Sequence, residues 1–233
     1  MKIRPIAGKN SVGASQPGRG RLFAWAGLVA FLIAIEYAAR LSGGTPDRNV
    51  LYRYSTAAGS VLIYLILLGV VLGIAGGRGL LALRRPSVSC GKALGMGLLL
   101  LIGTWIAIAI LDHFLHGARE QGLTPKGWEP AHAGAYAANF VAIAIVAPFV
   151  EELTFRGLGF SLLERYGKWF AIVAVGVAFG LAHGLVEALP ELALFGCALA
   201  WLRARTGSVF PGMLLHGTFN AISLIAAVTV HSS

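Results

Sequence analysis

The stretch Pro148-Phe-Val-Glu-Glu-Leu-Thr-Phe-Arg156 places two adjacent carboxylates and a guanidinium inside an apolar run from Ala137 to Leu163. Charge at membrane depth is costly, so it is usually paired, turned inward and functional. Arg156 follows Glu152 by four residues, the favourable order for an ion pair on one helix face. Glu151 points about 140° away from Arg156 at roughly 100° per residue. We therefore expect Arg156 to neutralise Glu152, whereas Glu151 needs a partner from elsewhere. The alternative is a purely structural charge cluster at a helix end.

The composition around this stretch indicates a membrane protein. Of the 233 residues, 57% are hydrophobic and 12% are charged, and the mean hydropathy is +0.74. A soluble domain carries about 25% charged residues, and runs of about 20 apolar residues are typical of transmembrane helices. The sequence therefore predicts an all-α, polytopic transmembrane bundle.

Apolar segments predict about seven spans, with a core made by the last four helices. The expected spans are 22–41, 55–76, 92–111, 136–164, 169–188, 189–204 and 208–230. The boundary between the fifth and sixth depends on Pro190, because proline does not continue a helix interior. The fourth span is longer than a bilayer requires, so we expect it to tilt, kink near Pro148 or emerge into the cytoplasm.

Basic residues orient this layout. Residues 1–20 are predicted to form a disordered basic tail, and residues 21–135 to hold the N-terminal transmembrane helices and an outer loop. With the N-terminus in the cytoplasm, 14 of the 19 Lys and Arg residues fall on the inner side, as the positive-inside rule requires. The other five are Arg40, Arg48, Arg53, Arg119 and Lys126. The net charge of +9 is thus mainly a topology signal, and the expected partner is the lipid bilayer, with no nucleic acid.

Polar residues of the fourth, fifth and seventh spans carry the expected chemistry. Phe179 and His183 are four residues apart, as are His216 and Asn220, so each pair shares a helix face. Singly, each could be a buried polar residue that bonds across helices. However, the turns of the chain bring Glu151, His183 and the second pair to comparable depths. Such convergence favours an active site.

The expected reaction is hydrolysis. A carboxylate and a neutral imidazole can hold a water molecule, and the carboxylate can remove its proton as a general base. A second histidine and an amide could donate hydrogen bonds to the developing oxyanion. Two histidines and a carboxylate, here His183, His216 and Glu151, are equally a catalytic zinc set, so both mechanisms stay open.

In chain order, Glu151-Glu152-x-x-x-Arg156, Phe179-x-x-x-His183 and His216-x-x-x-Asn220 resemble the three motifs of the CPBP family. This family groups CAAX prenyl endopeptidases with bacteriocin-processing and immunity-type membrane proteins. The resemblance implies that residues 136–230 form the catalytic transmembrane core.

The resemblance also implies roles for these residues. Glu151 and His183 would activate water, and His216 and Asn220 would stabilise the tetrahedral intermediate. Supporting roles would fall to Glu152, Arg156 and Phe179. The better-characterised relatives resemble glutamate-dependent, metal-free enzymes, which implies no cofactor, with zinc as the alternative.

The implied function is that of an intramembrane endopeptidase acting on a membrane-associated protein or peptide. We expect a multi-pass protein of the bacterial plasma or inner membrane, with its N-terminus in the cytoplasm. Two other functions fit the sequence. One is a non-catalytic immunity or scaffold protein of the same fold, and the other is a proton-coupled transporter, since buried Glu and His also serve proton relays. Many transporters are built from internal repeats, and the sequence contains no recognisable repeat, which weakens the transporter hypothesis.

Overall fold

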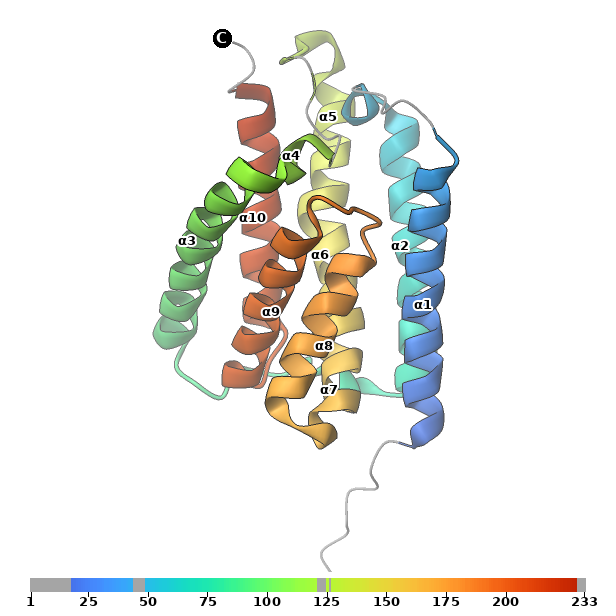
Figure 1. The fold of residues 1–233 in the computed structure, drawn as a ribbon, viewed down its shortest axis with the longest axis vertical. Helices are drawn as coiled ribbons and strands as arrows, with labels where there is room; N and C mark the ends of the chain where they lie inside the picture. The colour runs from blue at the N-terminus through green and yellow to red at the C-terminus, as the bar shows by residue number, and fades with distance from the viewer. Residues whose placement is uncertain (1–17, 44–48, 121–124, 126, 230–233) are drawn as a thin grey trace, which may run out of the picture.

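The computed structural model describes residues 18–43, 49–120, 125 and 127–229, and this part of the chain contains helices and no strand. Seven helical rods stand side by side, roughly parallel to the long axis of the molecule (Figure 1). The all-α bundle predicted from the sequence is therefore confirmed. Most of the predicted basic tail, residues 1–17, lies outside the described residues.

Three rods come from the N-terminal half, and four come from residues 130–229. The first three are α1 (Arg19–Leu41), α2 (Tyr54–Ala75) and α3 (Cys90–Leu115). Short elements connect them and follow them: η1 (Val50–Tyr52), η2 (Arg78–Leu81) and α4 (Gly117–Glu120). The last three rods are α8 (Lys168–Leu181), α9 (Leu189–Thr206) and α10 (Phe210–Thr229).

The central rod is one long helical segment, Pro130–Tyr166, of 37 residues. It changes its winding along its length. Its parts are η3 (Pro130–His132), α5 (Ala133–Val141), η4 (Ala142–Val146), α6 (Ala147–Glu152), η5 (Leu153–Gly159), α7 (Phe160–Leu163) and η6 (Glu164–Tyr166). The segments η4 and η5 are π-helical, a winding that is frequent at functional sites.

Five of the described helices are long and apolar enough to cross a membrane: α1, α2, α3, the central rod and α10. The helix α8 is apolar but shorter. Large apolar side chains such as Ile63, Leu99 and Ile106 are exposed along α2 and α3. Exposed apolar surface of this extent requires a non-aqueous surrounding, here lipid. The chain is a membrane protein.

The fifth span was predicted too long. It was expected to reach residue 188, but α8 ends at Leu181. Gly184 adopts φ +66°, a left-handed conformation that helix interiors exclude. The chain then runs irregularly to Leu189, and Pro190 lies in the first turn of α9, as expected for a proline at a helix start.

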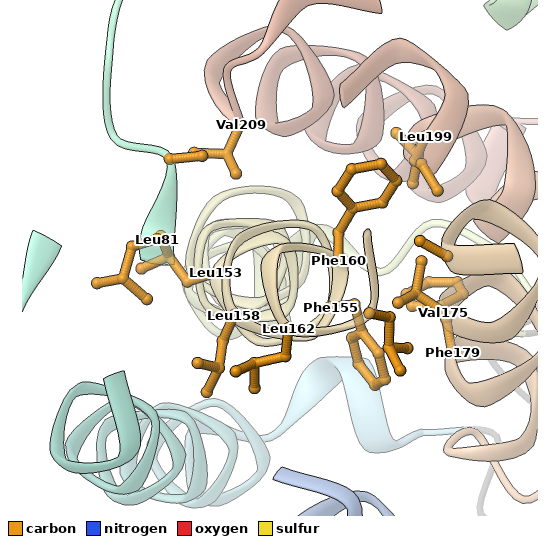
Figure 2. Packing of buried hydrophobic residues seen from close by; sticks show 14 of the residues in the cluster. Leu81, Leu153, Phe155, Leu158, Phe160, Leu162, Val175, Phe179, Leu199 and Val209 are labelled. Atoms are coloured by element: carbon orange, nitrogen blue, oxygen red, sulfur yellow. The ribbon is translucent and has the colours of Figure 1, made fainter. Parts of the chain in front are cut away.

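The core surrounds the central rod. Leu153, Leu158, Phe160 and Leu162 of this rod are almost completely buried. They point outward on different sides, with Phe160 directed toward Leu199 of α9 (Figure 2). Because neighbours enclose the rod from several directions, Glu152 and Arg156 in its middle lie inside the protein.

Candidate active site

Glu152 and Arg156 form a completely buried ion pair in the central rod. Arg156 Nη1 donates to Glu152 Oε1 at 2.9 Å, the i,i+4 contact expected from the sequence. Arg156 Nη2 donates to the carbonyl oxygen of Gly196 in α9, also at 2.9 Å. The pair thus ties the central rod to α9. Its place in the interior is consistent with a supporting role.

Helix α10 approaches this ion pair at a glycine. A Cβ atom on Gly212 would lie 2.5 Å from Glu152 Oε2. One turn further along α10, His216 Nδ1 lies 3.3 Å from Glu152 Oε1. Since a carboxylate oxygen only accepts, Nδ1 carries the proton and donates it to Glu152. The buried carboxylate therefore orients the His216 ring.

Glu151 has different surroundings. Its side chain is 14% exposed, whereas that of Glu152 is fully buried. Tyr64 of α2 donates its hydroxyl hydrogen to Glu151 Oε1 at 2.5 Å. The other oxygen, Oε2, lies 3.7 Å from His216 Nε2. This separation exceeds a hydrogen bond, but both atoms could contact one water molecule.

His183 lies just beyond the end of α8, in a turn rather than in the helix that the sequence predicted. Its backbone N–H donates to the Gly180 carbonyl at 3.2 Å. Its ring Nδ1 lies 2.7 Å from the carbonyl oxygen of Phe179, which fixes the proton on Nδ1. In the neutral ring, Nε2 then carries a lone pair and can accept a proton or a hydrogen bond.

Phe179 packs between the other polar groups. Its ring centroid lies 4.5 Å from that of His183 and 5.6 Å from that of His216. The Arg156 guanidinium carbon lies 4.4 Å from the same centroid, within cation–π range. This buried ring therefore spaces the two imidazoles and covers the arginine.

Asn220 meets the central rod at η4. Its Nδ2 donates to the Ile143 carbonyl at 2.9 Å. In η4 the N–H of Ala147 bonds to the Ala142 carbonyl, and Pro148 has no N–H to give. The Ile143 carbonyl thus lacks a backbone donor and takes one from Asn220. One amide hydrogen of Asn220 remains available for another acceptor.

The structure therefore brings together residues from several rods. Glu151, Glu152, Arg156 and His216 form one contact chain, and Phe179 links it to His183. Asn220 lies one turn further along α10 than His216 and bonds to the central rod at Ile143. Among the described residues, Glu151 and His183 share no direct hydrogen bond, so a joint action requires a water molecule between them.

A catalytic zinc ion would need Glu151, His183 and His216 to converge on one point as ligands. In the described ranges, no three His, Cys, Asp or Glu side chains are grouped as ligands of a metal ion. The set Glu151, His183 and His216 accordingly does not form a ready zinc site in this conformation. We derive no step through a metal.

Sequence reasoning missed Tyr64. It lies on the inward stripe of α2 with Ala57, Leu67, Val71 and Ala75. The spacing of these residues follows the helical repeat. A tyrosine hydroxyl on an otherwise apolar inward stripe needs a hydrogen-bond partner, and this signal could have identified it.

The irregular segment between α8 and α9 lies beside the site and is held by Glu120 of α4. The two Glu120 carboxylate oxygens accept from the N–H groups of Val186 and Ala188, each at 2.9 Å. Arg40 of α1 forms an ion pair with the same carboxylate. Burial raises the pKa of Glu120, but these backbone donors and Arg40 outweigh burial and lower the pKa below its ordinary value.

Comparison with known proteins agrees with this picture. Residues 133–222 match the family described as type II CAAX prenyl endopeptidase, Rce1-like. YdiL of Bacillus subtilis (strain 168), a candidate membrane peptidase, is 27% identical over 207 residues, which cover 83% of this chain and 82% of that protein. No solved structure matches significantly. The matched domain and this distant relative support the resemblance to the CPBP family of membrane proteases that the three motifs carry.

Proposed function

We propose that this protein is a glutamate-dependent intramembrane endopeptidase that hydrolyses a peptide bond of a membrane-associated protein or peptide. The observation that best supports this is the orientation of the two imidazole rings. His183 and His216 each direct Nδ1 to an acceptor, and His216 turns Nε2 toward the open side of Glu151. Catalytic imidazoles are commonly oriented in this way.

In the first step, Glu151 Oε2 and His183 Nε2 hold a water molecule. Glu151 removes a proton from the water, and the water oxygen attacks the carbonyl carbon of the substrate. The electron pair of the C=O bond moves to the oxygen and forms a tetrahedral oxyanion. When this intermediate collapses, the C–N bond breaks and the proton on Glu151 passes to the leaving amine.

The oxyanion would be stabilised by His216 and Asn220. His216 Nε2 donates when its ring is protonated, a state that the adjacent Glu151 and Glu152 carboxylates can balance. Asn220 would contribute the amide hydrogen that Ile143 does not use. Donors of this kind are worth several kcal/mol when they face the developing charge in a water-poor site.

Water needs a path to such a site. At 1.5 Å per residue the 14 residues of α8 extend about 21 Å, less than the roughly 30 Å of a hydrocarbon core. The loop after α8 ends below the tops of α2, α5 and α10 (Figure 1). Irregular backbone at membrane depth is tolerated where it is buried in protein or lines a water-filled cavity. His183 lies at the start of this loop and is partly exposed, so water would reach it there.

The proposal includes the orientation and the absence of a resident metal. The N-terminus would lie in the cytoplasm of a bacterium, with the protein in the plasma or inner membrane. Arg84 supports this arrangement, because its Nε donates to the Gly207 carbonyl and so brings basic residues to one end of the bundle. Residues 136–230 would act as the catalytic core.

Comparative proteomics of cells that carry the wild type or Glu151→Ala tests the function. The variant should accumulate uncleaved forms of one or more membrane-associated proteins, with new termini missing from the membrane and secreted fractions. Identical fractions at equal expression of the two proteins would contradict the proposal. That result would favour a non-catalytic immunity or scaffold role.

A further inference from the structure

Tyr64 lies in the middle of α2, outside the matched domain at residues 133–222. Its ring packs against the core around the central rod, beside Leu67 and Leu68 of its own helix. Its hydroxyl reaches across to Glu151 Oε1 at 2.5 Å. This short distance is typical of a charge-assisted bond from a hydroxyl to a carboxylate.

This bond gives the two carboxylate oxygens of Glu151 different surroundings. Oε1 is occupied by the Tyr64 hydroxyl, while Oε2 is turned toward His216 Nε2. A carboxylate that is held at one oxygen can rotate little about its last torsion. Since catalytic groups must be held within about 0.5 Å of productive geometry, a fixed Oε1 also fixes where Oε2 meets water.

We propose that Tyr64 is a positioning residue for Glu151: its hydroxyl holds Oε1 and so aims the free oxygen at the attacking water. This inference rests on the proposed role of Glu151 as general base. It assigns part of the catalytic machinery to the N-terminal half of the chain. The helix α2 would thus take part in catalysis and not serve only as a membrane anchor.

The other charged groups around Glu151 come from three elements. His216 of α10 faces Oε2, and Glu152 and Arg156 lie on the central rod itself. From α1, Glu36 packs at Gly184, next to His183, where a Cβ atom on the glycine would lie 2.6 Å from the Glu36 Cβ. None of these groups donates to Oε1 in the described residues, so Tyr64 is the donor that a substitution can remove selectively.

Infrared difference spectroscopy during a pH titration, in lipid nanodiscs, tests the inference without a known substrate. The carboxyl band that is missing from Glu151→Gln identifies Glu151. In Tyr64→Phe the ionised carboxylate loses a donor while the ring packing remains. Its antisymmetric stretching band should therefore shift in frequency, because the hydrogen-bond donor to Oε1 is lost.

The matched control is Tyr136→Phe. It removes another tyrosine hydroxyl, one that donates to the Leu224 carbonyl at 2.7 Å, and should leave the Glu151 band unchanged. The same position of the Glu151 carboxylate band in the wild type and Tyr64→Phe would overturn the inference. So would equal shifts in both Phe variants, because these would indicate a general loss of packing.

The proteomic comparison separates this inference from the proposed function. Cells with Tyr64→Phe should accumulate the same uncleaved proteins as cells with Glu151→Ala, in smaller amounts. If Glu151→Ala causes accumulation and Tyr64→Phe causes none, the positioning role is wrong and the protease function stands. If neither causes accumulation, the proposed function itself fails, and with it the catalytic meaning of the Tyr64 contact.

Discussion

Glu151 and Glu152 are adjacent in the chain, yet the fold gives them opposite surroundings. Glu152 is fully buried and contacts Arg156 and His216. Glu151 is partly exposed, with one oxygen on Tyr64 and the other toward the site. Two carboxylates in different environments can take different roles, and in the proposed mechanism Glu152 orients His216 while Glu151 is the general base.

A pair of substitutions separates these roles. Arg156→Ala should destabilise the protein by about 3–5 kcal/mol, because it leaves Glu152 as an unpaired buried charge. Glu151→Gln should abolish proteolysis and leave stability nearly unchanged, since it keeps the shape of the side chain. Thermal unfolding in detergent measures both. Equal stability of Arg156→Ala and the wild type would show that the ion pair is not structural.

The two residues on α10 can be examined as oxyanion donors. His216→Ala and Asn220→Ala should each lower turnover by about 10²–10³ with little change in substrate binding. Ser223→Ala is the control, because this hydroxyl bonds only within α10, to the Phe219 carbonyl, and its loss should not alter turnover. An unchanged kcat in Asn220→Ala would show that Asn220 does not stabilise the oxyanion and has only a structural role through its bond with Ile143.

Local spacing was enough to predict some contacts and not others. The Glu152–Arg156 pair follows from four residues on one helix face, and the structure contains it. Tyr64 is 87 residues from Glu151, and no local pattern joins them. The link between Asn220 and Ile143 depends on the π-helical winding before Pro148, which hydropathy does not encode.

At the scale of elements, α4 holds the loop that follows α8. The sequence predicted a helix through residue 188 because the segment is apolar. The helix instead ends at Leu181, and donors left free beyond it are satisfied by Glu120, from a distant part of the chain. Such tertiary capping is not visible in a single apolar run.

The lowered pKa of Glu120 gives this contact a pH dependence. A carboxyl whose pKa is lower in the folded state contributes stability above its unfolded pKa, about 4.3 for Glu, and loses it as the pH falls through the folded value. Hydrogen-exchange protection at Val186 and Ala188 should therefore be constant near neutral pH and fall only in strong acid.

Glu120→Ala should remove this protection at every pH. Glu129→Ala is the control, since Glu129 pairs with His132 at the start of the central rod and not with the loop. If both amides keep their hydrogen-exchange protection in Glu120→Ala, the loop does not depend on α4.

At the scale of the whole molecule, the number and order of the rods were predictable, since each apolar segment became a helix. The orientation in the membrane is a separate prediction. A reporter fused after Ser233 should appear outside, and one inserted near Arg84 should appear in the cytoplasm. The reverse location at both sites would overturn the proposed topology. Cysteine accessibility at the same two positions provides an independent measurement.

The central claim is that Glu151 drives peptide hydrolysis without a metal. The most direct measurement uses purified protein in liposomes, treated with a strong chelator, and an uncleaved protein that accumulates with Glu151→Ala. The wild type should cleave this protein with well below one zinc per chain, and Glu151→Gln should not cleave it. Cleavage by Glu151→Gln, or wild-type activity that chelation removes and zinc restores, would contradict the account.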